Sequence, residues 1–179
     1  MDEFTIRDFL VRHYPRVVAG LALTCDSRAL AEDAVQEALV RAWERSERGE
    51  EIRSIDAWVS VVATNLVRSR FRRLRVERRE RSRRAHDAHA GSSVGWPAGE
   101  AAEDRLQVVR ALAALPRRQR EATVLRYYLD LDVAEVARAL GVSEGTAKTT
   151  LHRARVALAA ALGGTGARME EEANDRVEP

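Results

Sequence analysis

Cysteine is nearly absent from this 179-residue sequence, which contains only Cys25. A single thiol forms neither an internal disulfide nor a metal cluster of several thiolates, so we expect a reduced, cytoplasmic chain. We interpret Cys25 as a small residue packed between helices, with a nucleophilic thiol as the alternative. The four histidines lack the spacing to cysteine or acidic residues that is typical of zinc sites, so no metal site is expected.

Aromatic residues are scarce as well, at 5% of the sequence, and the hydrophobic residues are mostly alanine, valine and leucine. This mixture favours helices over strands, so we expect an all-α protein. No apolar run approaches the roughly 20 residues that span a bilayer, so no membrane insertion is expected. Asp2 and Glu3 precede Arg7, which is not the pattern of a secretory leader. Phosphate-binding loops and nucleophile motifs are also missing, which predicts a protein that is not an enzyme and has no cofactor.

Charge is distributed unevenly, although the net charge is only +2. Residues 68–84 contain ten arginines and two acidic residues, whereas residues 1–56 contain eight basic and twelve acidic residues. A compact basic block next to a more acidic segment indicates a polyanionic partner for one part of the molecule. A solvated, arginine-rich helix face is the alternative.

The N-terminal half has the periodicity of helices. One helix is predicted over residues 4–24, kinked or split at Pro15, and another over residues 29–46, capped by Asp26 or Ser27. A charged loop around Gly49 follows at residues 47–55.

After this loop, Asp56 is expected to cap a helix that runs into the arginine block near residue 80, with Trp58, Val62 and Leu66 in the core. Residues 85–103 are rich in small residues and glycine, which is typical of a flexible linker. We therefore predict two small helical domains, residues 1–84 and 104–162, and a disordered acidic tail over residues 163–179.

The second domain is predicted to contain a helix-turn-helix. A helix that begins near residue 104 ends before Pro116, and another is predicted over residues 117–129. Asp132 and Glu135 fit an N-terminal capping pattern, Gly141 suits a left-handed helix end, and Ser143 can cap the last helix. The expected inner-face residues are Val133, Val136, Ala137 and Leu140 in the first helix, Val142 in the turn, and Ala147, Leu151, Ala154 and Leu158 in the second.

This order, with small polar residues first and basic residues later on the outer face of the last helix, suits a recognition helix in the DNA major groove. Spacing alone does not distinguish it from an ordinary helical hairpin.

Four stretches of the sequence resemble bacterial sigma-70-type factors of the extracytoplasmic-function (ECF) group. Residues 31–43 (AEDAVQEALVRAW) resemble region 2.2, and residues 56–73 (DAWVSVVATNLVRSRFRR) resemble regions 2.3 and 2.4. Residues 115–141 (LPRRQREATVLRYYLDLDVAEVARALG) and 140–158 (LGVSEGTAKTTLHRARVAL) resemble region 4. Members often have arginine where this chain has Thr150, so their promoter preferences do not carry over.

The resemblance implies three binding surfaces. Region 2.2 docks on a coiled coil of the large subunit of core RNA polymerase, and one polar stripe there contains Asp33, Gln36, Glu37 and Arg41. The next helix meets the minus-ten promoter element as opened strand through Asn65, Arg68, Arg70, Arg72 and Arg73. The last helix reads the minus-thirty-five element as duplex through Ser143, Glu144, Gly145, Thr146, Lys148, Thr149, His152, Arg153 and Arg155.

We therefore interpret the chain as a sigma factor that binds core RNA polymerase, directs it to promoters and assists promoter opening. An autonomous helix-turn-helix regulator that binds duplex DNA as a dimer is one alternative, and a helical protein-interaction adaptor is another. Many members of the group are held by an anti-sigma factor, and the resemblance is compatible with such a partner for this chain. The sequence does not reveal the promoter, the regulon or the inducing signal.

Overall fold

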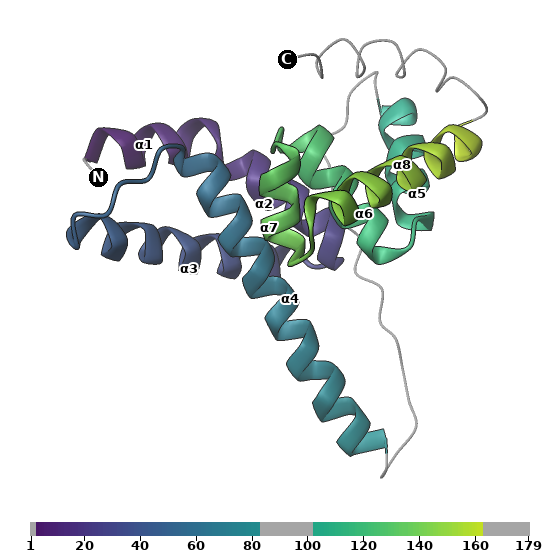
Figure 1. Cartoon of the computed structure of the whole chain (residues 1–179), viewed down its shortest axis with the longest axis horizontal. Helices are drawn as coiled ribbons and strands as arrows, with labels where there is room; N and C mark the ends of the chain where they lie inside the picture. Colours follow the sequence, from purple (N-terminus) through teal and green to yellow (C-terminus); the bar gives the residue numbers. More distant parts are fainter. Residues whose placement is uncertain (1–2, 83–101, 163–179) are drawn as a thin grey trace.

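The structure, a computed structural model, describes residues 3–82 and 102–162, with side chains placed for residues 5–73 and 105–162. Within these ranges every regular element is helical, which confirms the predicted all-α class (Figure 1). The predicted tail and nearly all of the predicted linker lie outside the described residues.

Two helices form where a single one was considered. Helix α1 (Glu3–Arg12) ends one residue before helix α2 (Tyr14–Cys25), and Pro15 is the second residue of α2. Proline is tolerated there because the first turn of a helix leaves its N–H groups without intrahelical partners. The predicted helix is therefore split into two near Pro15, which is one of the two predicted outcomes.

The turn into helix α3 (Arg28–Glu47) is closed by two capping residues. Asp26 adopts a left-handed conformation with φ of 53° after α2, and the Ser27 hydroxyl accepts a hydrogen bond from the Leu30 N–H at 3.3 Å. Cys25 is buried beside this turn, and its thiol donates to the Ser27 carbonyl at 3.1 Å. Burial raises the pKa of the thiol, which fits the interpretation of Cys25 as a packing residue.

Helix α4 (Ile55–Ser82) begins one residue before Asp56. Asp56 is therefore not the cap that was expected. Ser54 takes that position, because its hydroxyl accepts a hydrogen bond from the Ala57 N–H at 3.3 Å. The predicted core positions of this helix are also shifted by one residue.

The fully buried face of α4 contains Val59, Ala63 and Val67. The expected core residues Trp58, Val62 and Leu66 are only half-buried and pack at the margin of the core.

The C-terminal group begins with helices α5 (Ala102–Ala114) and α6 (Arg117–Thr123). The helix predicted over residues 117–129 changes its winding midway, because residues Val124–Tyr128 form a π-helical turn, η1. The Leu129 N–H donates to the Val124 carbonyl, five residues earlier, at 2.9 Å. Helices α7 (Val133–Leu140) and α8 (Glu144–Ala161) then form the predicted helix-turn-helix.

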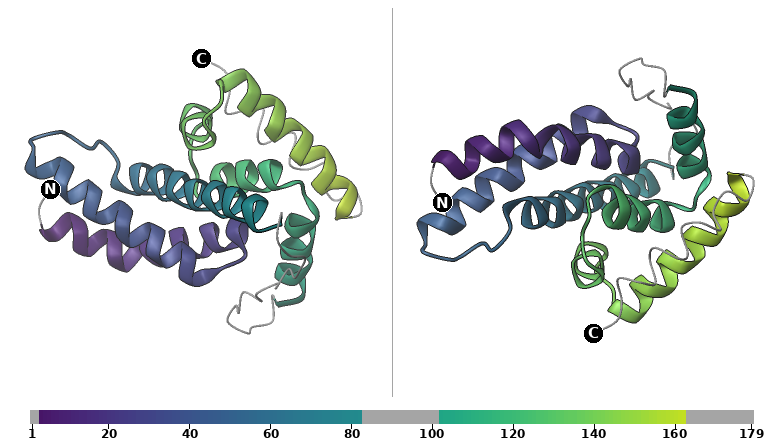
Figure 2. Two further views of the ribbon diagram at one scale, coloured as in Figure 1. Left: turned by 90° about the horizontal axis from the view of Figure 1, so that it is seen from below. Right: turned by 90° about the horizontal axis from the view of Figure 1, so that it is seen from above.

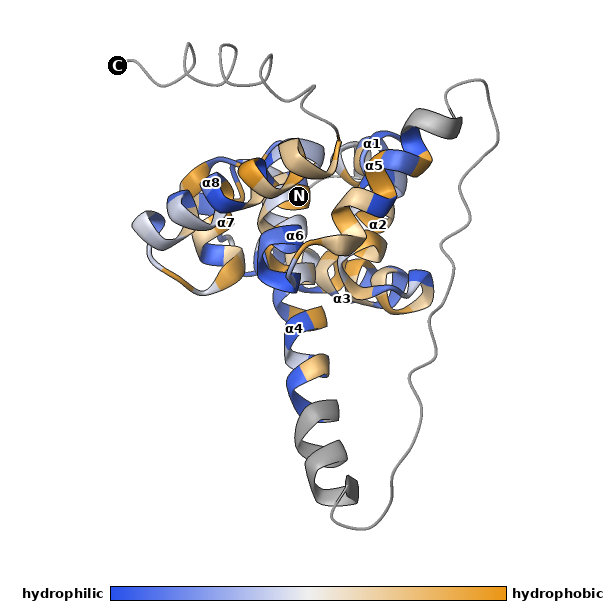
Figure 3. Cartoon of the chain, turned by 90° about the vertical axis from the view of Figure 1, so that its right-hand side faces the viewer, coloured by the Kyte–Doolittle hydropathy of each residue, from blue (hydrophilic) through white to orange (hydrophobic). Residues whose placement is uncertain are grey.

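The two groups of helices share one hydrophobic core. Leu21, Val35 and Val59 of the N-terminal group belong to the same buried cluster as Leu125 and Leu140 of the C-terminal group. Helix α7 packs against α4, the C-terminal helices lie beside α4 in both views of Figure 2, and α2 is coloured largely as hydrophobic in Figure 3. The two predicted domains are therefore packed on each other rather than held apart.

Candidate nucleic-acid interface

The helix-turn-helix is built by short-range capping. The Glu135 N–H donates to the Asp132 carboxylate at 2.6 Å, and the Asp132 N–H donates to the Glu135 carboxylate at 2.9 Å. These two bonds are a complete capping box at the start of α7. Gly141 ends α7 with φ of +62°, a left-handed conformation that glycine adopts without strain, so the chain turns sharply into α8.

Helix α8 separates an apolar face from a polar one. Ala147, Leu151 and Ala154 are buried, as predicted. The Ser143 hydroxyl accepts from the Thr146 N–H at 3.3 Å and caps the helix. The structure leaves exposed nearly all of the predicted minus-thirty-five residues: Ser143, Glu144, Gly145, Thr146, Lys148, Thr149, His152 and Arg153. Arg155 is half-buried.

Hydroxyl groups on the exposed face are partly used within the helix. The Thr149 hydroxyl donates to the Gly145 carbonyl at 2.9 Å, and the Thr150 hydroxyl donates to the Thr146 carbonyl at 2.7 Å. The proton of each hydroxyl is therefore engaged by the backbone. The methyl group of Thr149 remains as the part of that side chain without a hydrogen-bonding role.

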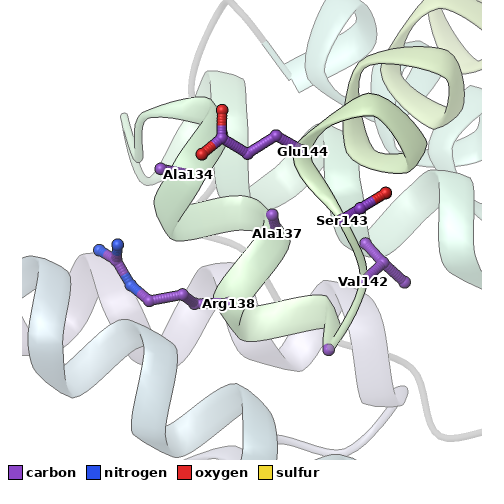
Figure 4. A pocket seen from close by; sticks show the side chains of 7 residues that line it. Ala134, Ala137, Arg138, Val142, Ser143 and Glu144 are labelled. Atoms are coloured by element: carbon purple, nitrogen blue, oxygen red, sulfur yellow. The ribbon is translucent and has the colours of Figure 1, made fainter.

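A shallow pocket opens where α7 meets the start of α8 (Figure 4). Ala137 and Val142 form its apolar wall, while Arg138 and Glu144 are its charged residues and lie well apart. The pocket adjoins the exposed first turn of α8. It therefore belongs to the same face of the helix-turn-helix as the predicted recognition residues.

The predicted minus-ten residues on α4 are in different surroundings. Asn65, Arg72 and Arg73 are exposed. Arg68 is only 23% exposed, because its guanidinium donates to the Ala139 carbonyl at 2.9 Å and lies 3.8 Å from the Glu121 carboxylate. Burial lowers the pKa of Arg68, although Glu121 opposes the shift. The structure thus places this predicted DNA contact inside the junction between the two groups of helices.

The predicted polymerase stripe on α3 is exposed but not free of partners. Arg41 pairs with Glu37 at 2.6 Å, one turn apart, and Arg70 of α4 pairs with Asp33 at 3.2 Å. Gln36 is exposed between these pairs.

Two apolar side chains on α3 were missed by the sequence analysis. Val40 is 57% exposed and Trp43 is 43% exposed. Val40 follows Gln36 by four residues and Glu37 by three, and Trp43 follows Gln36 by seven, so both lie on the side of the helix that carries Gln36. This spacing in the sequence was the signal that could have added Val40 and Trp43 to the predicted stripe.

The described residues provide neither a metal-binding cluster nor a membrane-spanning helix. No group of three or more histidine, cysteine or acidic side chains is gathered there in a way that could bind a metal ion. None of the helices in these ranges has both the length and the apolar content of a membrane span.

Comparison with known proteins identifies the two groups of helices. The family model for sigma-70 region 2 matches residues 10–77, and the model for sigma-70 region 4 matches residues 105–158. The ECF RNA polymerase sigma factor SigL of Mycobacterium tuberculosis is 36% identical over 146 residues, which cover 78% of this chain and 77% of SigL. SigM of the same organism is 30% identical over 164 residues, covering 90% of this chain and 79% of SigM.

A solved structure resembles this fold over most of the chain. The sigma factor RpoE of Bartonella quintana, crystallised in complex with the anti-sigma factor NepR, matches with a TM-score of 0.73 and 25% identity, covering 90% of this chain and 98% of RpoE. Helices α1–α4 therefore contain region 2, and α5–α8 contain region 4. The chain belongs to the ECF group of the sigma-70 family, and it is a sigma factor that directs RNA polymerase to promoters.

Proposed function

We propose that the two regions divide promoter recognition between them. Region 4 reads the minus-thirty-five element as duplex through α8, and region 2 captures the minus-ten element as opened strand through α4. The observation that carries this proposal is the two-faced helix α8, with Ala147, Leu151 and Ala154 buried and a continuous polar face exposed. A helix of this kind fits the major groove with its first turns at the base edges.

Roles along α8 follow from side-chain chemistry. Glu144 can accept from a cytosine amino group, and Lys148 can donate to guanine O6 or N7. Arg153 and Arg155 lie farther along the helix and contact phosphates, which supply affinity without sequence preference. Gly145 has no side chain and faces open space, since no atom lies within 4 Å of the position that a Cβ would take there, so its backbone can approach DNA closely.

On α4, the exposed side chains of Asn65, Arg72 and Arg73 can meet the opened strand directly. Asn65 is suited to a base edge, and the two arginines to the backbone. Arg68 joins them once it leaves its partners in region 4.

The α3 stripe is the docking surface for core polymerase. Asp33, Gln36 and Glu37 provide charge and hydrogen-bond acceptors, and Val40 and Trp43 add an apolar centre. An apolar centre with a polar margin is the usual composition of a protein interface. Such a factor acts in the cytoplasm, beside the chromosome.

An anti-sigma protein is a further proposed partner. The structural relative RpoE is held by the anti-sigma factor NepR, and its likeness extends over both regions of this chain. We infer that a protein of this class can hold the present chain in the same packed arrangement.

The deciding experiment is transcription by purified core RNA polymerase, with and without the chain, on genomic fragments enriched by the reconstituted holoenzyme. Discrete transcripts that require both components are expected. Footprints produced by the chain alone would favour an autonomous dimeric regulator. Absence of any salt-dependent DNA binding would favour a protein-interaction adaptor.

A further inference from the structure

A row of arginines runs along helix α4 and continues past the residues proposed to meet the minus-ten element. At 100° per residue, the members of this arginine row lie within about 60° of one another around the helix: Arg68, Arg72, Arg75 and Arg79. From position 68 to position 79 the helix rises about 16 Å, at 1.5 Å per residue. The last two members have no role in the functions described so far.

The arginine row lies nearly opposite the packed face of α4. Val59, Ala63 and Val67 are buried, and they are centred roughly 155° away from the row around the helix. Arg72 is exposed, and so is Asn65, which lies on the same side one turn before the row. The C-terminal end of α4 projects beyond the other helices (Figure 1). The face proposed to meet the opened strand at Asn65 therefore continues into the row.

Acidic residues on this part of α4 are placed away from the arginine row. Side chains three or four residues apart are neighbours on a helix, and none of these positions around Arg72, Arg75 and Arg79 holds an acidic residue. Glu77 and Glu80 lie on the other half of the helix. Like charges at this spacing repel, so the row destabilises an isolated helix. Such an arrangement fits an anionic partner that neutralises the row.

Duplex DNA is the polyanion that matches the arginine row. The guanidinium group binds phosphate oxygens through paired hydrogen bonds. Each DNA strand carries one phosphate charge per 3.4 Å of helix axis, so the row spans about five base pairs. Binding of single strands relies on aromatic side chains on which the bases stack, and residues 74–82 contain none.

The order of the two regions in the chain places this duplex upstream of the minus-ten element. Region 4, which is proposed to read the minus-thirty-five element, follows α4 in the sequence. Because the minus-thirty-five element lies upstream of the minus-ten element, the C-terminal end of α4 is directed toward upstream DNA. The order Asn65, Arg72, Arg79 along the helix then follows the promoter from the opened strand into the duplex.

We propose that the arginine row of α4 binds phosphates of the duplex immediately upstream of the minus-ten element and so holds the edge of the opened region. This inference rests on the proposed capture of the minus-ten element by α4, and it adds Arg75 and Arg79 to the DNA contacts. Arg68, which donates to the Ala139 carbonyl in this structure, is not needed for the contact. Phosphates are alike at every base pair, so the row supplies affinity without sequence preference.

The test uses two double variants of the full chain with equal loss of charge. Arg75→Gln with Arg79→Gln is the row variant, and Arg78→Gln with Arg81→Gln is the control variant. Arg78 and Arg81 belong to the same end of α4 but lie about 95° and 155° from the row around the helix. Glutamine resembles arginine in helix propensity, so both variants should keep the helix content of the wild type.

Binding is measured with holoenzyme reconstituted from purified core polymerase, on two probes that contain the minus-ten sequence of the enriched genomic fragments. One probe is a fork, in which about 12 base pairs of duplex, more than twice the span of the row, lead into a single-stranded minus-ten element. The other probe is the same strand without its complement. Neither probe includes the minus-thirty-five element, so the base contacts of region 4 do not contribute.

The wild type should bind the fork more tightly than the single strand. The row variant should lose this preference, and the control variant should keep it. Loss of two phosphate contacts should also lower the slope of log affinity against log salt concentration by about 1.8 on the fork. Over a fourfold rise in salt concentration, the wild type should therefore lose about twelvefold more affinity for the fork than the row variant does.

Three results would overturn the proposal. Equal weakening of the row variant on both probes would mean that the row meets the opened strand. Weaker binding of the row variant to core polymerase would mean that the row is a polymerase contact. Equal effects of the row and control variants on the fork would mean that charge attracts DNA diffusely, without a row.

Failure of the proposed function is recognised separately, with the wild type alone. Holoenzyme that binds the single-stranded minus-ten probe no better than a scrambled strand would contradict capture of that element by region 2. Specific wild-type binding to this probe, together with a row variant that behaves as wild type on the fork, would contradict the arginine row and leave the proposed function standing.

Discussion

Arg70 of α4 and Asp33 of α3 form an ion pair, with 3.2 Å between Nη1 and Oδ2. The pair joins a side chain proposed to meet promoter DNA to one proposed to meet core polymerase. Both side chains are substantially exposed, so the pair itself adds little to stability, about 0.2–1 kcal/mol at most. Its interest lies in the proposed function, because a polymerase that engaged Asp33 in the proposed way would leave Arg70 available to DNA.

The first prediction concerns the polymerase stripe. Replacing Asp33 and Glu37 by alanine should weaken binding to core polymerase, because charge-assisted hydrogen bonds contribute about 1.5–3 kcal/mol each. Helix content should not change. Competition against an unmodified sigma factor for core enzyme measures the effect. Glu32→Ala is the control, since it removes another α3 carboxylate that pairs with Arg28 and is not one of the proposed stripe residues. Equal losses in both variants would contradict a specific stripe.

The second prediction separates base reading from phosphate contact on α8. Lys148→Ala should cost roughly 1–3 kcal/mol of binding and relax preference at one or two base pairs. Arg153→Ala should weaken all promoter sequences about equally and lower the salt slope by about one. A binding series over mutated promoters and salt concentrations distinguishes them. Uniform weakening by Lys148→Ala would mean that the helix docks at another angle.

The third prediction is that Gly145→Ala has opposite effects on stability and on DNA binding. A Cβ at this position meets no atom within 4 Å, so the free chain should be unharmed and gain up to about 1 kcal/mol from helix propensity. Promoter binding should weaken, because the methyl group keeps the backbone away from the DNA. Thermal unfolding tests the expected gain in stability, and promoter binding by the same preparation tests the expected loss of affinity. Unchanged binding would show that the backbone stays distant from DNA.

The fourth prediction concerns pH and the start of α4. Burial alone would raise the pKa of Asp56, but hydrogen bonds from the Ser54 hydroxyl and from the Ala57 and Asp56 N–H groups, with the nearby His13, lower it overall. A carboxylate whose pKa is lower in the folded state than in the unfolded state stabilises the fold at pH values above its unfolded-state pKa. That stabilisation is lost as the pH falls through the folded-state pKa.

Asp56→Asn should therefore reduce the free energy of unfolding at neutral pH by less than about 1 kcal/mol, since the carboxylate is partly exposed. The difference from wild type should disappear in acid, below the folded-state pKa. Denaturant unfolding at several pH values measures it. A difference that persists in acid would mean that the carboxylate charge is not the cause.

Local features of the fold could be predicted because their causes lie within a few residues. Pro15, the Asp132–Glu135 capping box and Gly141 each act on the nearest turn. The sigma-family resemblance likewise placed the regions in the correct order. The π-helical turn at Val124–Tyr128 was missed, because nothing in the apolar spacing of residues 117–129 distinguishes it from an α-helix.

The junction between the regions was beyond such reasoning. Arg68 and Ala139 are 71 residues apart, and Arg16 and Tyr128 are 112 apart, so no local pattern connects them. Arg68 looks in sequence like any other arginine of the basic block. Only the packing of α7 against α4 shows that it has a partner within the chain.

The last prediction concerns which part of the Thr149 side chain contacts a base. Its hydroxyl proton is engaged by the Gly145 carbonyl at 2.9 Å, while the side chain remains exposed on the recognition face. The methyl group is then the part of Thr149 that can meet DNA, and threonine methyl groups pack against the C5-methyl group of thymine. Thr149→Val keeps the shape and should retain promoter binding. Thr149→Ser keeps the hydroxyl but loses the methyl, and should cost about 0.8 kcal/mol, the value of one buried methylene-sized group. Because both variants alter the same position, each serves as the control of the other, and promoter binding at a fixed salt concentration gives the comparison. If Thr149→Ser bound the promoter as well as the wild type and Thr149→Val bound it more weakly, the result would show that the hydroxyl leaves the Gly145 carbonyl to contact a base or a phosphate.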